Sequence, residues 1–294
     1  AVALPLAAVL ASPVLEQFSP AQGRFGATVT LSGQRFDPSP AANRVLFNGV
    51  AAPVLQASAT ALTVRVPAGA SSGTVQVITA EGGTRSAQSF TVHQPPTLTS
   101  LTPAEGVPGS LVTLGGTYFA SVAAHDTVWF GGVPALVQQA SATALTVVVP
   151  ATAPTGRVRI STLGGTAESP QEFVVWYPPT ITRFSPARGK AGTVVTLEGS
   201  NFGPATRNEV SFGPVAATVL QASATTLQVR VPAGAGTGPL GLRTPGGPVQ
   251  SAASFTFLPA PVITSFAPTQ GTVGEVLTLT GENFLLDGLA DTIY

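Results

Sequence analysis

Two histidines and a scatter of carboxylates are the residues that could do acid–base or metal chemistry. His93 stands alone, whereas His125 and Asp126 are adjacent and could supply half of a catalytic triad or two metal ligands. Neighbours on an extended chain point apart, which favours a solvated loop at this pair. The glutamates are dispersed, at Glu105, Glu168, Glu172, Glu198 and Glu209. No two of them suggest the paired carboxylates of a glycosidase cleft, so we predict no enzyme, catalytic residue, metal or cofactor.

The composition excludes several other classes of protein. The 13 basic and 13 acidic residues cancel, and without a basic patch we expect no nucleic-acid binding. The absence of cysteine excludes disulfides, thiolate catalysis and Cys-ligated zinc. No apolar run approaches the ~18 residues of a membrane helix, so we expect no direct membrane insertion within this segment. Apolar residues make up 44% of the chain, which is enough for packed cores.

An internal repeat of about 83 residues organises the chain. Its first marker is a proline that follows Phe or Leu and a small residue, and that recurs at Pro20, Pro103, Pro186 and Pro268. A Gly-x-x-Gly and then Thr-Leu-x-Gly-x-x-Phe follow each proline, the latter ending at Phe36, Phe119, Phe202 and Phe284. Further markers are Ala-Ser-Ala-Thr, Leu-x-Val-x-Val-Pro and a Gly-Gly pair, each present three times. Self-similarity of this kind indicates tandem copies of one fold.

Each copy is predicted to be an antiparallel β-sandwich of seven short strands. Leu62, Val64 and Val66 alternate with polar residues, a period of two that is typical of half-buried strands. The proline after Val66 should end its strand because proline cannot donate to a ladder. The Gly-Gly pairs are expected to form two-residue hairpin turns in which both glycines take positive φ.

These motifs resemble the IPT/TIG family, the immunoglobulin-like fold of plexins and certain transcription factors. The resemblance implies an all-β protein of tandem immunoglobulin-like (E-set/TIG type) antiparallel β-sandwiches, arranged as beads on a rod. Similar arrays in bacterial secreted and surface proteins act as spacers, as adhesive modules or beside glycan-active domains. The transcription-factor branch binds DNA through basic loops, which this sequence lacks, so DNA binding is not implied here.

The repeat register gives the domain boundaries. Residues 13–94, 95–177 and 178–259 form three repeats, and 260–294 an incomplete fourth, since Asp291–Tyr294 aligns with the start of a third strand. We interpret the chain as a fragment of a longer one; the alternative is completion of the half-domain by a strand from another chain. The apolar stretch 1–12 resembles the end of an export signal peptide, or else the tail of a preceding linker.

Function is expected where the repeats differ. Trp129 should point outward between core residues, and Arg157 or Arg159 on the sixth strand should flank it in the same sheet. Tyr118 departs from the repeat in a nearby loop. These four residues are a candidate carbohydrate platform, and the alternative is a cation–π pair that only decorates the sheet. Trp176 and Tyr177, at the junction of the second and third repeats, are candidate interdomain packing residues, and prolines at 95–96 and 178–179 should stiffen the junctions.

The resulting hypothesis is a non-catalytic structural or interaction segment, a stalk, spacer or adhesive array, of an exported cell-surface or secreted protein. Its expected partners are a polysaccharide or another surface protein. Two alternatives remain at this point. One is a carbohydrate-binding module that uses the exposed aromatics of the second repeat. The other is an accessory region of a polysaccharide-active enzyme whose catalytic domain lies outside this chain.

Overall fold

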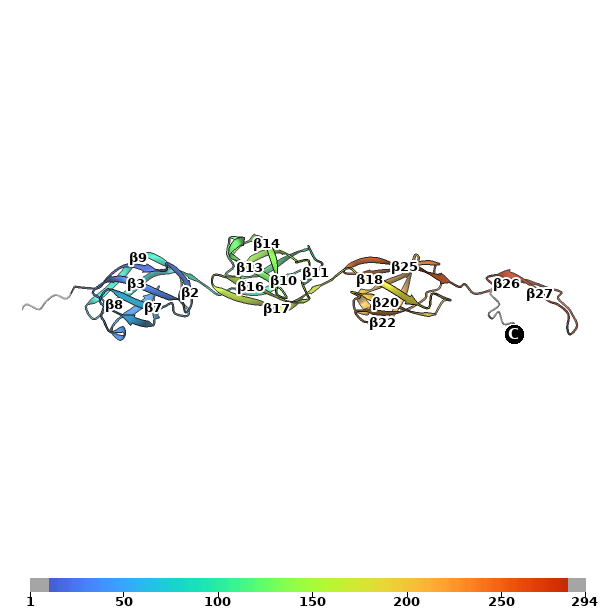
Figure 1. The fold of residues 1–294 in the computed structure, drawn as a ribbon, viewed down its shortest axis with the longest axis horizontal. Helices are drawn as coiled ribbons and strands as arrows, with labels where there is room; N and C mark the ends of the chain where they lie inside the picture. The colour runs from blue at the N-terminus through green and yellow to red at the C-terminus, as the bar shows by residue number, and fades with distance from the viewer. Residues whose placement is uncertain (1–10, 285–294) are drawn as a thin grey trace, which may run out of the picture. The chain divides into compact units, whose positions relative to one another are not determined.

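The computed structural model describes residues 11–284, in which regular structure is almost entirely β-strand. Repeats 1, 2 and 3 (residues 13–94, 95–177 and 178–259) each fold into two β-sheets packed face to face (Figure 1). The described chain divides into two compact units, with the boundary between Val175 and Trp176. No helix of the described part is long and apolar enough to cross a membrane.

Repeat 1 contains nine strands and one short 3-10 turn. They are β1 (Val14–Ser19), β2 (Gln22–Arg24), β3 (Thr28–Gln34), the turn η1 (Pro40–Ala42), β4 (Arg44–Phe47), β5 (Val50–Ala52), β6 (Val54–Ala57), β7 (Ala61–Arg65), β8 (Gly73–Thr79) and β9 (Gly82–His93). One sheet has the order β1-β3-β7-β6 and the other β2-β9-β8-β4-β5. All pairs are antiparallel except β2 with β9.

Repeats 2 and 3 keep this topology with one strand fewer. Repeat 2 has β10 (Thr97–Thr102), β11 (Glu105–Gly106), β12 (Leu111–Thr117), η2 (Ala123–His125), β13 (Thr127–Phe130), β14 (Val133–Ala140), β15 (Ala144–Val148), β16 (Gly156–Thr162) and β17 (Gly165–Val175). Repeat 3 has β18 (Thr180–Ser185), β19 (Arg188–Gly189), β20 (Val194–Ser200), η3 (Ala205–Arg207), β21 (Glu209–Phe212), β22 (Val215–Ala222), β23 (Thr226–Arg230), β24 (Gly238–Thr244) and β25 (Gly247–Phe257). The long strands β14 and β22 each run from one sheet into the other.

Pro53 explains the extra strand of repeat 1, because it interrupts there the segment that is continuous in β14 and β22. The prediction of seven strands was therefore too low. It also missed the short β2, β11 and β19, which pair in parallel with the last strand of their repeat. These short strands hydrogen-bond the end of each repeat to its own beginning.

Alternating apolar residues fill each core, as the period of two predicts. In repeat 2, Val112, Leu114, Leu145 and Val147 are fully buried, and their counterparts in repeats 1 and 3 are equally buried. Two phenylalanine rings meet edge to face at the centre of every sandwich, with ring centroids 5.0, 5.1 and 4.9 Å apart in repeats 1, 2 and 3. The aromatic pair thus repeats as faithfully as the aliphatic core.

The predicted geometry of the Gly-Gly turns was wrong. In repeat 2 the turn residues are Leu163 and Gly164, since Thr162 pairs with Gly165. Positive φ is confined to Gly165, which begins the returning strand. Gly164 is needed for a different reason, because a Cβ built on it would overlap the carbonyl oxygen of Gln94 in the linker that enters this repeat. The glycine therefore allows a close approach of two backbone segments.

A two-stranded hairpin follows repeat 3 and is formed by β26 (Val262–Ala267) and β27 (Thr278–Glu282) (Figure 1). It shares the register shift that the first strand pair of each sandwich shows. Each of the four equivalent Xaa-Pro bonds is cis: Ser19-Pro20, Thr102-Pro103, Ser185-Pro186 and Ala267-Pro268. Leu279 is half-buried, whereas its counterpart Leu197 is fully buried in repeat 3. The alignment of Asp291–Tyr294 lies outside the described residues.

Candidate functional site

Trp129 and Arg159 form a pair on the outer face of repeat 2. They are directly opposite each other on β13 and β16, as the alternation and sheet order predicted. The guanidinium carbon of Arg159 lies 5.6 Å from the centroid of the half-buried Trp129 ring, a cation–π contact. Because the guanidinium already covers the ring, a sugar could stack on that face only after Arg159 had moved.

The four predicted platform residues do not come together. Arg157 faces Glu172 across the β16–β17 ladder, and its Nη1 donates to the Ser169 carbonyl at 3.4 Å. Tyr118 lies in the loop between β12 and β13 and lines a recess at the end of the sandwich. The predicted platform is therefore two separate features, a Trp–Arg pair on the sheet and an aromatic residue at the recess.

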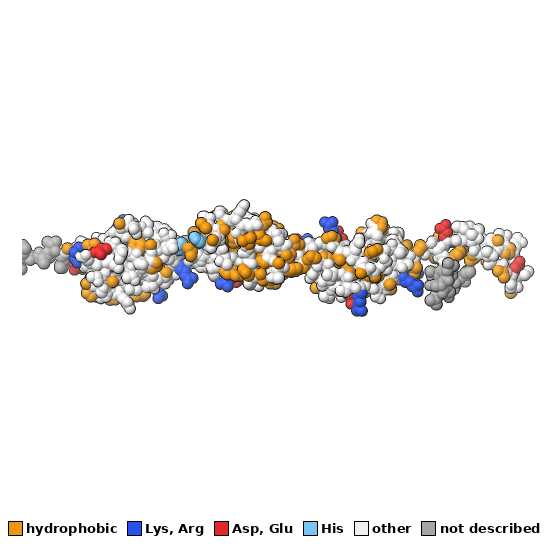
Figure 2. Space-filling view, turned by 45° about the horizontal axis from the view of Figure 1, so that its top comes forward, with side chains coloured by type: hydrophobic (Ala, Val, Ile, Leu, Met, Phe, Trp, Pro, Cys, Tyr) orange, Lys and Arg blue, Asp and Glu red, His pale blue; other side chains and the backbone are white. Residues whose placement is uncertain are grey.

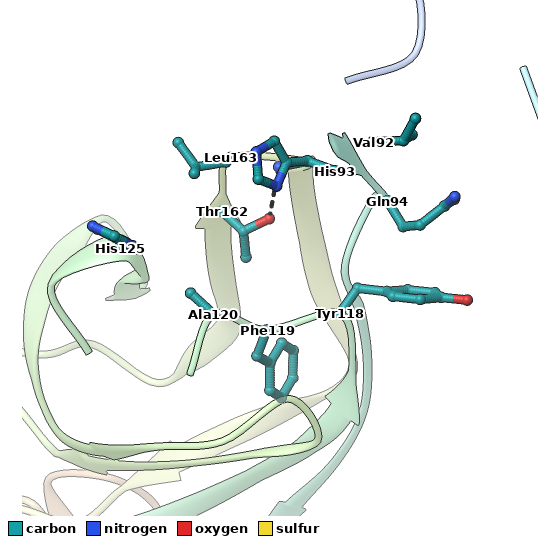
Figure 3. Close-up of a pocket in the computed structure, with 10 residues that line it drawn as sticks. Val92, His93, Gln94, Tyr118, Phe119, Ala120, His125, Thr162 and Leu163 are labelled. Carbon is teal, nitrogen blue, oxygen red and sulfur yellow. Dashed lines mark hydrogen bonds between the residues drawn. The ribbon is translucent and has the colours of Figure 1, made fainter. Parts of the chain in front are cut away.

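The recess has a volume of about 360 Å³ and is built from three segments that are distant in sequence. These are the end of β9 with the following Gln94 (residues 92–94), the loop 118–125 and the end of β16 with the β16–β17 turn (residues 162–164). Figure 3 shows the His93 ring by Thr162 and Leu163, His125 to one side, and the Tyr118 ring extending to the other side below Gln94. Both histidines of the chain thus line one recess, which their separation in sequence did not predict.

None of the residues that line the recess is Asp, Glu, Lys or Arg. Figure 2 shows pale-blue histidine atoms where repeat 1 meets repeat 2, and only scattered charged side chains on the face in view. The rim of the recess is apolar, because Tyr118 and Leu163 line it and expose 57% and 53% of their surface.

Asp126 is buried, so the expectation of a solvated loop at His125-Asp126 was wrong for this residue. It is only 5% exposed and stands where repeats 1 and 3 have the buried Asn43 and Asn208. Its Oδ1 accepts the Ala120 N–H at 3.0 Å, but its Oδ2 is buried without a hydrogen-bond partner. Burial raises the pKa of the Asp126 carboxyl above its usual value, against the lowering effects of that hydrogen bond and of His125.

The asparagines of repeats 1 and 3 make hydrogen bonds that the Asp126 carboxylate of repeat 2 cannot make. The Asn43 amide nitrogen donates to the carbonyls of Asp37 and Ser39, at 2.7 and 2.9 Å. That of Asn208 donates to the carbonyls of Gly203 and Pro204. An ionised Asp126 has no proton to donate to the corresponding carbonyls of repeat 2. Asn43 and Asn208, at the aligned positions of repeats 1 and 3, are the sequence signal that could have predicted the burial of Asp126.

The two candidate packing residues lie against repeat 3. The Trp176 ring lies 3.4 Å from the position that a Cβ on Gly203 would take. The Tyr177 carbonyl approaches Gly246 as the Gln94 carbonyl approaches Gly164. Among residues 11–284, no three His, Asp or Glu side chains gather closely enough to hold a metal ion.

The family model of the IPT/TIG domain matches residues 13–92, 96–175 and 179–257, which together are most of the chain. The chain belongs to the IPT/TIG family. Its three tandem TIG domains coincide with repeats 1 to 3, and the immunoglobulin-like all-β fold that the motifs implied is confirmed. No curated protein matches this TIG array in sequence.

Several solved structures are similar to the TIG array in fold. A structure solved with a xylogluco-oligosaccharide is 18% identical, with a TM-score of 0.41, over 83% of this chain and 60% of the other. The extracellular region of plexin A4 is 20% identical, with a TM-score of 0.33, over 96% of this chain and 26% of the other. A surface glycan-binding protein from Prevotella bryantii is 19% identical, with a TM-score of 0.30, over 57% and 44%. The array spans at most 60% of the length of these proteins.

Proposed function

We propose that this TIG array is a non-catalytic structural and interaction segment, a stalk, spacer or adhesive array, of an exported cell-surface or secreted protein. The observation that carries the proposal is the junction of repeats 1 and 2, where the linker is held by both repeats. A spacer needs such a junction, because a freely jointed linker would not keep its two ends apart.

Gln94 is the residue that both repeats hold. The preceding residue, His93, still pairs with Arg24 in the β2–β9 ladder of repeat 1. The Gln94 side chain donates to the Ala70 carbonyl of repeat 1 at 2.9 Å, while its own carbonyl packs against Gly164 of repeat 2. Gln94 therefore contacts both sandwiches, which supports a junction of restricted movement.

The distribution of sequence differences supports an interaction role rather than catalysis. The core and the buried serine of the last strand are common to all three repeats. The differences lie on outer faces and at the sandwich ends, as at Trp129, Tyr118 and Arg207. A shared core with surface residues that differ between repeats is suited to binding that differs from one repeat to the next.

We also infer that the β26–β27 hairpin begins a fourth repeat. The Asn283 amide donates to the Ala260 carbonyl at 3.1 Å, as that of Asn201 does to Pro178 at 2.9 Å. Asn283 and Asn201 share a left-handed backbone, with φ of 63° and 59°. This inference supports the interpretation of the chain as an array that continues the same unit.

Two measurements test the proposed role. Antibodies against the array should label intact source cells or their medium, and protease treatment of intact cells should remove any cell-bound signal; labelling only after lysis would contradict export. Neutral polysaccharides incubated with the chain should show no new reducing ends. Release of reducing ends would contradict a non-catalytic role.

A further inference from the structure

A recess of repeat 3 shares three lining positions with the recess of repeat 2, those of His125, Thr162 and Leu163. The second recess, of about 580 Å³, lies between the loop 206–209 and the β24–β25 turn at 243–248. Thr162 and Thr244 play the same part, since each hydroxyl oxygen accepts the N–H of a turn glycine at 3.1 Å. The family fold therefore provides a recess at this corner, while the lining residues belong to each repeat.

The linings of the two recesses differ in charge. The recess of repeat 3 is lined by Arg207, Glu209 and Arg243, of which only Arg207 has a counterpart in the lining of the repeat 2 recess; that recess has no Asp, Glu, Lys or Arg. His125 stands in repeat 2 at the position of Arg207, and Leu163 at that of Pro245. Charge complementarity thus favours a neutral ligand for repeat 2.

Tyr118 has the same left-handed backbone as its counterparts Arg35, Asn201 and Asn283. Its φ is 60°, a left-handed conformation that asparagine adopts readily and a bulky residue does not. The corresponding Arg35, Asn201 and Asn283 each donate a side-chain hydrogen bond to the linker that enters their repeat. Arg35 has the same conformation, with a φ of 59°, so the left-handed backbone belongs to the fold, and what tyrosine gives up at this position is the side-chain hydrogen bond to the linker.

Instead of such a hydrogen bond, repeat 2 has exposed apolar side chains in this region. Tyr118 and Leu163, which are 57% and 53% exposed, line the recess, and Val122, which is 55% exposed, lies in the same loop as Tyr118. Their counterparts are smaller or polar in repeat 1 (Arg35, Ser39 and Ala80) and in repeat 3 (Asn201, Pro204 and Pro245). Exposed apolar groups collected beside a recess mark a binding site more often than scattered ones do.

We propose that this recess binds a short segment of a neutral oligosaccharide or polysaccharide. Leu163 on one side and the Tyr118 ring on the other offer apolar surface to the C–H faces of successive pyranose rings, and the imidazoles of His93 and His125 can exchange hydrogen bonds with hydroxyls of the segment. The volume of about 360 Å³ lies in the range of small-ligand sites. An extended peptide is disfavoured, because the recess is lined by loops and a turn and not by a free strand edge.

The inference deepens the interaction role proposed above and moves the sugar site from Trp129 to Tyr118. The test uses the full chain, titrated with maltohexaose, cellohexaose, xylohexaose and mannohexaose. Amide resonances of residues 118–125 and 162–164 should shift with at least one of these probes. Binding by none of the four, or shifts only elsewhere, would overturn the sugar site.

Variants taken from the sister repeats separate binding from folding. Tyr118→Asn installs the residue that repeat 3 carries at the same backbone conformation, so the fold should persist while the affinity falls about tenfold or more. Leu163→Ala, the residue of repeat 1, should weaken binding in the same direction. Trp129→Ser, the residue of repeat 3, is the matched control and should leave the affinity unchanged.

The outcomes also separate this inference from the proposed function. Unchanged affinity in Tyr118→Asn, or lost affinity in Trp129→Ser alone, would overturn the recess as the sugar site. Either result would leave the junction at Gln94, and with it the spacer role, untouched. A flexible junction would instead count against the spacer role while the recess still bound sugar.

Discussion

Replacing Asp126 by asparagine should stabilise repeat 2 at neutral pH. The carboxylate is buried with one unpartnered oxygen, where Asn43 and Asn208 each donate two hydrogen bonds to loop carbonyls. Removing a buried unsatisfied group is worth about 1–3 kcal/mol, and each new hydrogen bond about 0.5–1.5 kcal/mol. We expect a gain of roughly 2 kcal/mol, which for a domain of this size raises Tm by roughly 8–16 °C.

The gain should depend on pH with a definite sign. The pKa of Asp126 is raised in the folded state, so its folded form binds protons more tightly than its unfolded form. The stability that this group contributes is present below its unfolded pKa and is lost as pH rises through its folded pKa. The advantage of Asp126→Asn should therefore grow from pH about 4 upward and then level off.

Tryptophan fluorescence in guanidinium can isolate repeat 2. The chain has two tryptophans, so a Trp176→Phe background leaves Trp129 as the reporter. The reciprocal change, Asn208→Asp, should destabilise repeat 3 and speed amide exchange in its strands. An Asp126→Asn variant no more stable than its parent at neutral pH, or a gain that does not change with pH, would refute the reasoning.

Three further changes test the frame around the sites. Ser169→Ala removes the hydroxyl that accepts the Val158 N–H and donates to the Gln171 carbonyl. The unfolding free energy of repeat 2, measured in denaturant, should fall by about 1–3 kcal/mol, and an unchanged unfolding midpoint would contradict this. Gly164→Ala should speed amide exchange around the turn because its Cβ overlaps the Gln94 carbonyl, whereas the counterpart Glu81→Ala should not; equal exchange in the two variants would count against this packing. Limited proteolysis followed by mass spectrometry should cut within 260–284 before the sandwiches, and a monomer that kept this segment intact would show protection that two strands do not provide.

The repeat register and the core were predictable because they depend on local patterns. Alternation over five to seven residues decides which side of a strand is buried, so Leu145 and Val147 could be assigned to the core from sequence. The same alternation, with the order of strands in the fold, predicted that Arg157 or Arg159 would flank Trp129, and the structure pairs Trp129 with Arg159. Turn geometry was less accessible, because the need for Gly164 comes from the linker packed on it and not from its own φ.

The recess could not be predicted because no local pattern describes it. His93, Tyr118 and Leu163 come from the end of a strand, a loop and a turn, and only the folded chain brings them together. Asp126 was a different failure, since the information was in the sequence. Asparagine at 43 and 208 marked the position as a buried capping site, and a carboxylate there differs from a solvated one.

The distance distribution between repeats 1 and 2 tests the central claim most directly. The chain has no cysteine, so Gln88→Cys and Gln171→Cys, both at exposed strand positions, would carry two specific spin labels. A junction held at Gln94 predicts a single narrow distribution by pulsed electron paramagnetic resonance, which a Gly-Ser insertion after Gln94 should broaden. A distribution already as broad without the insertion would contradict the account of the array as a spacer.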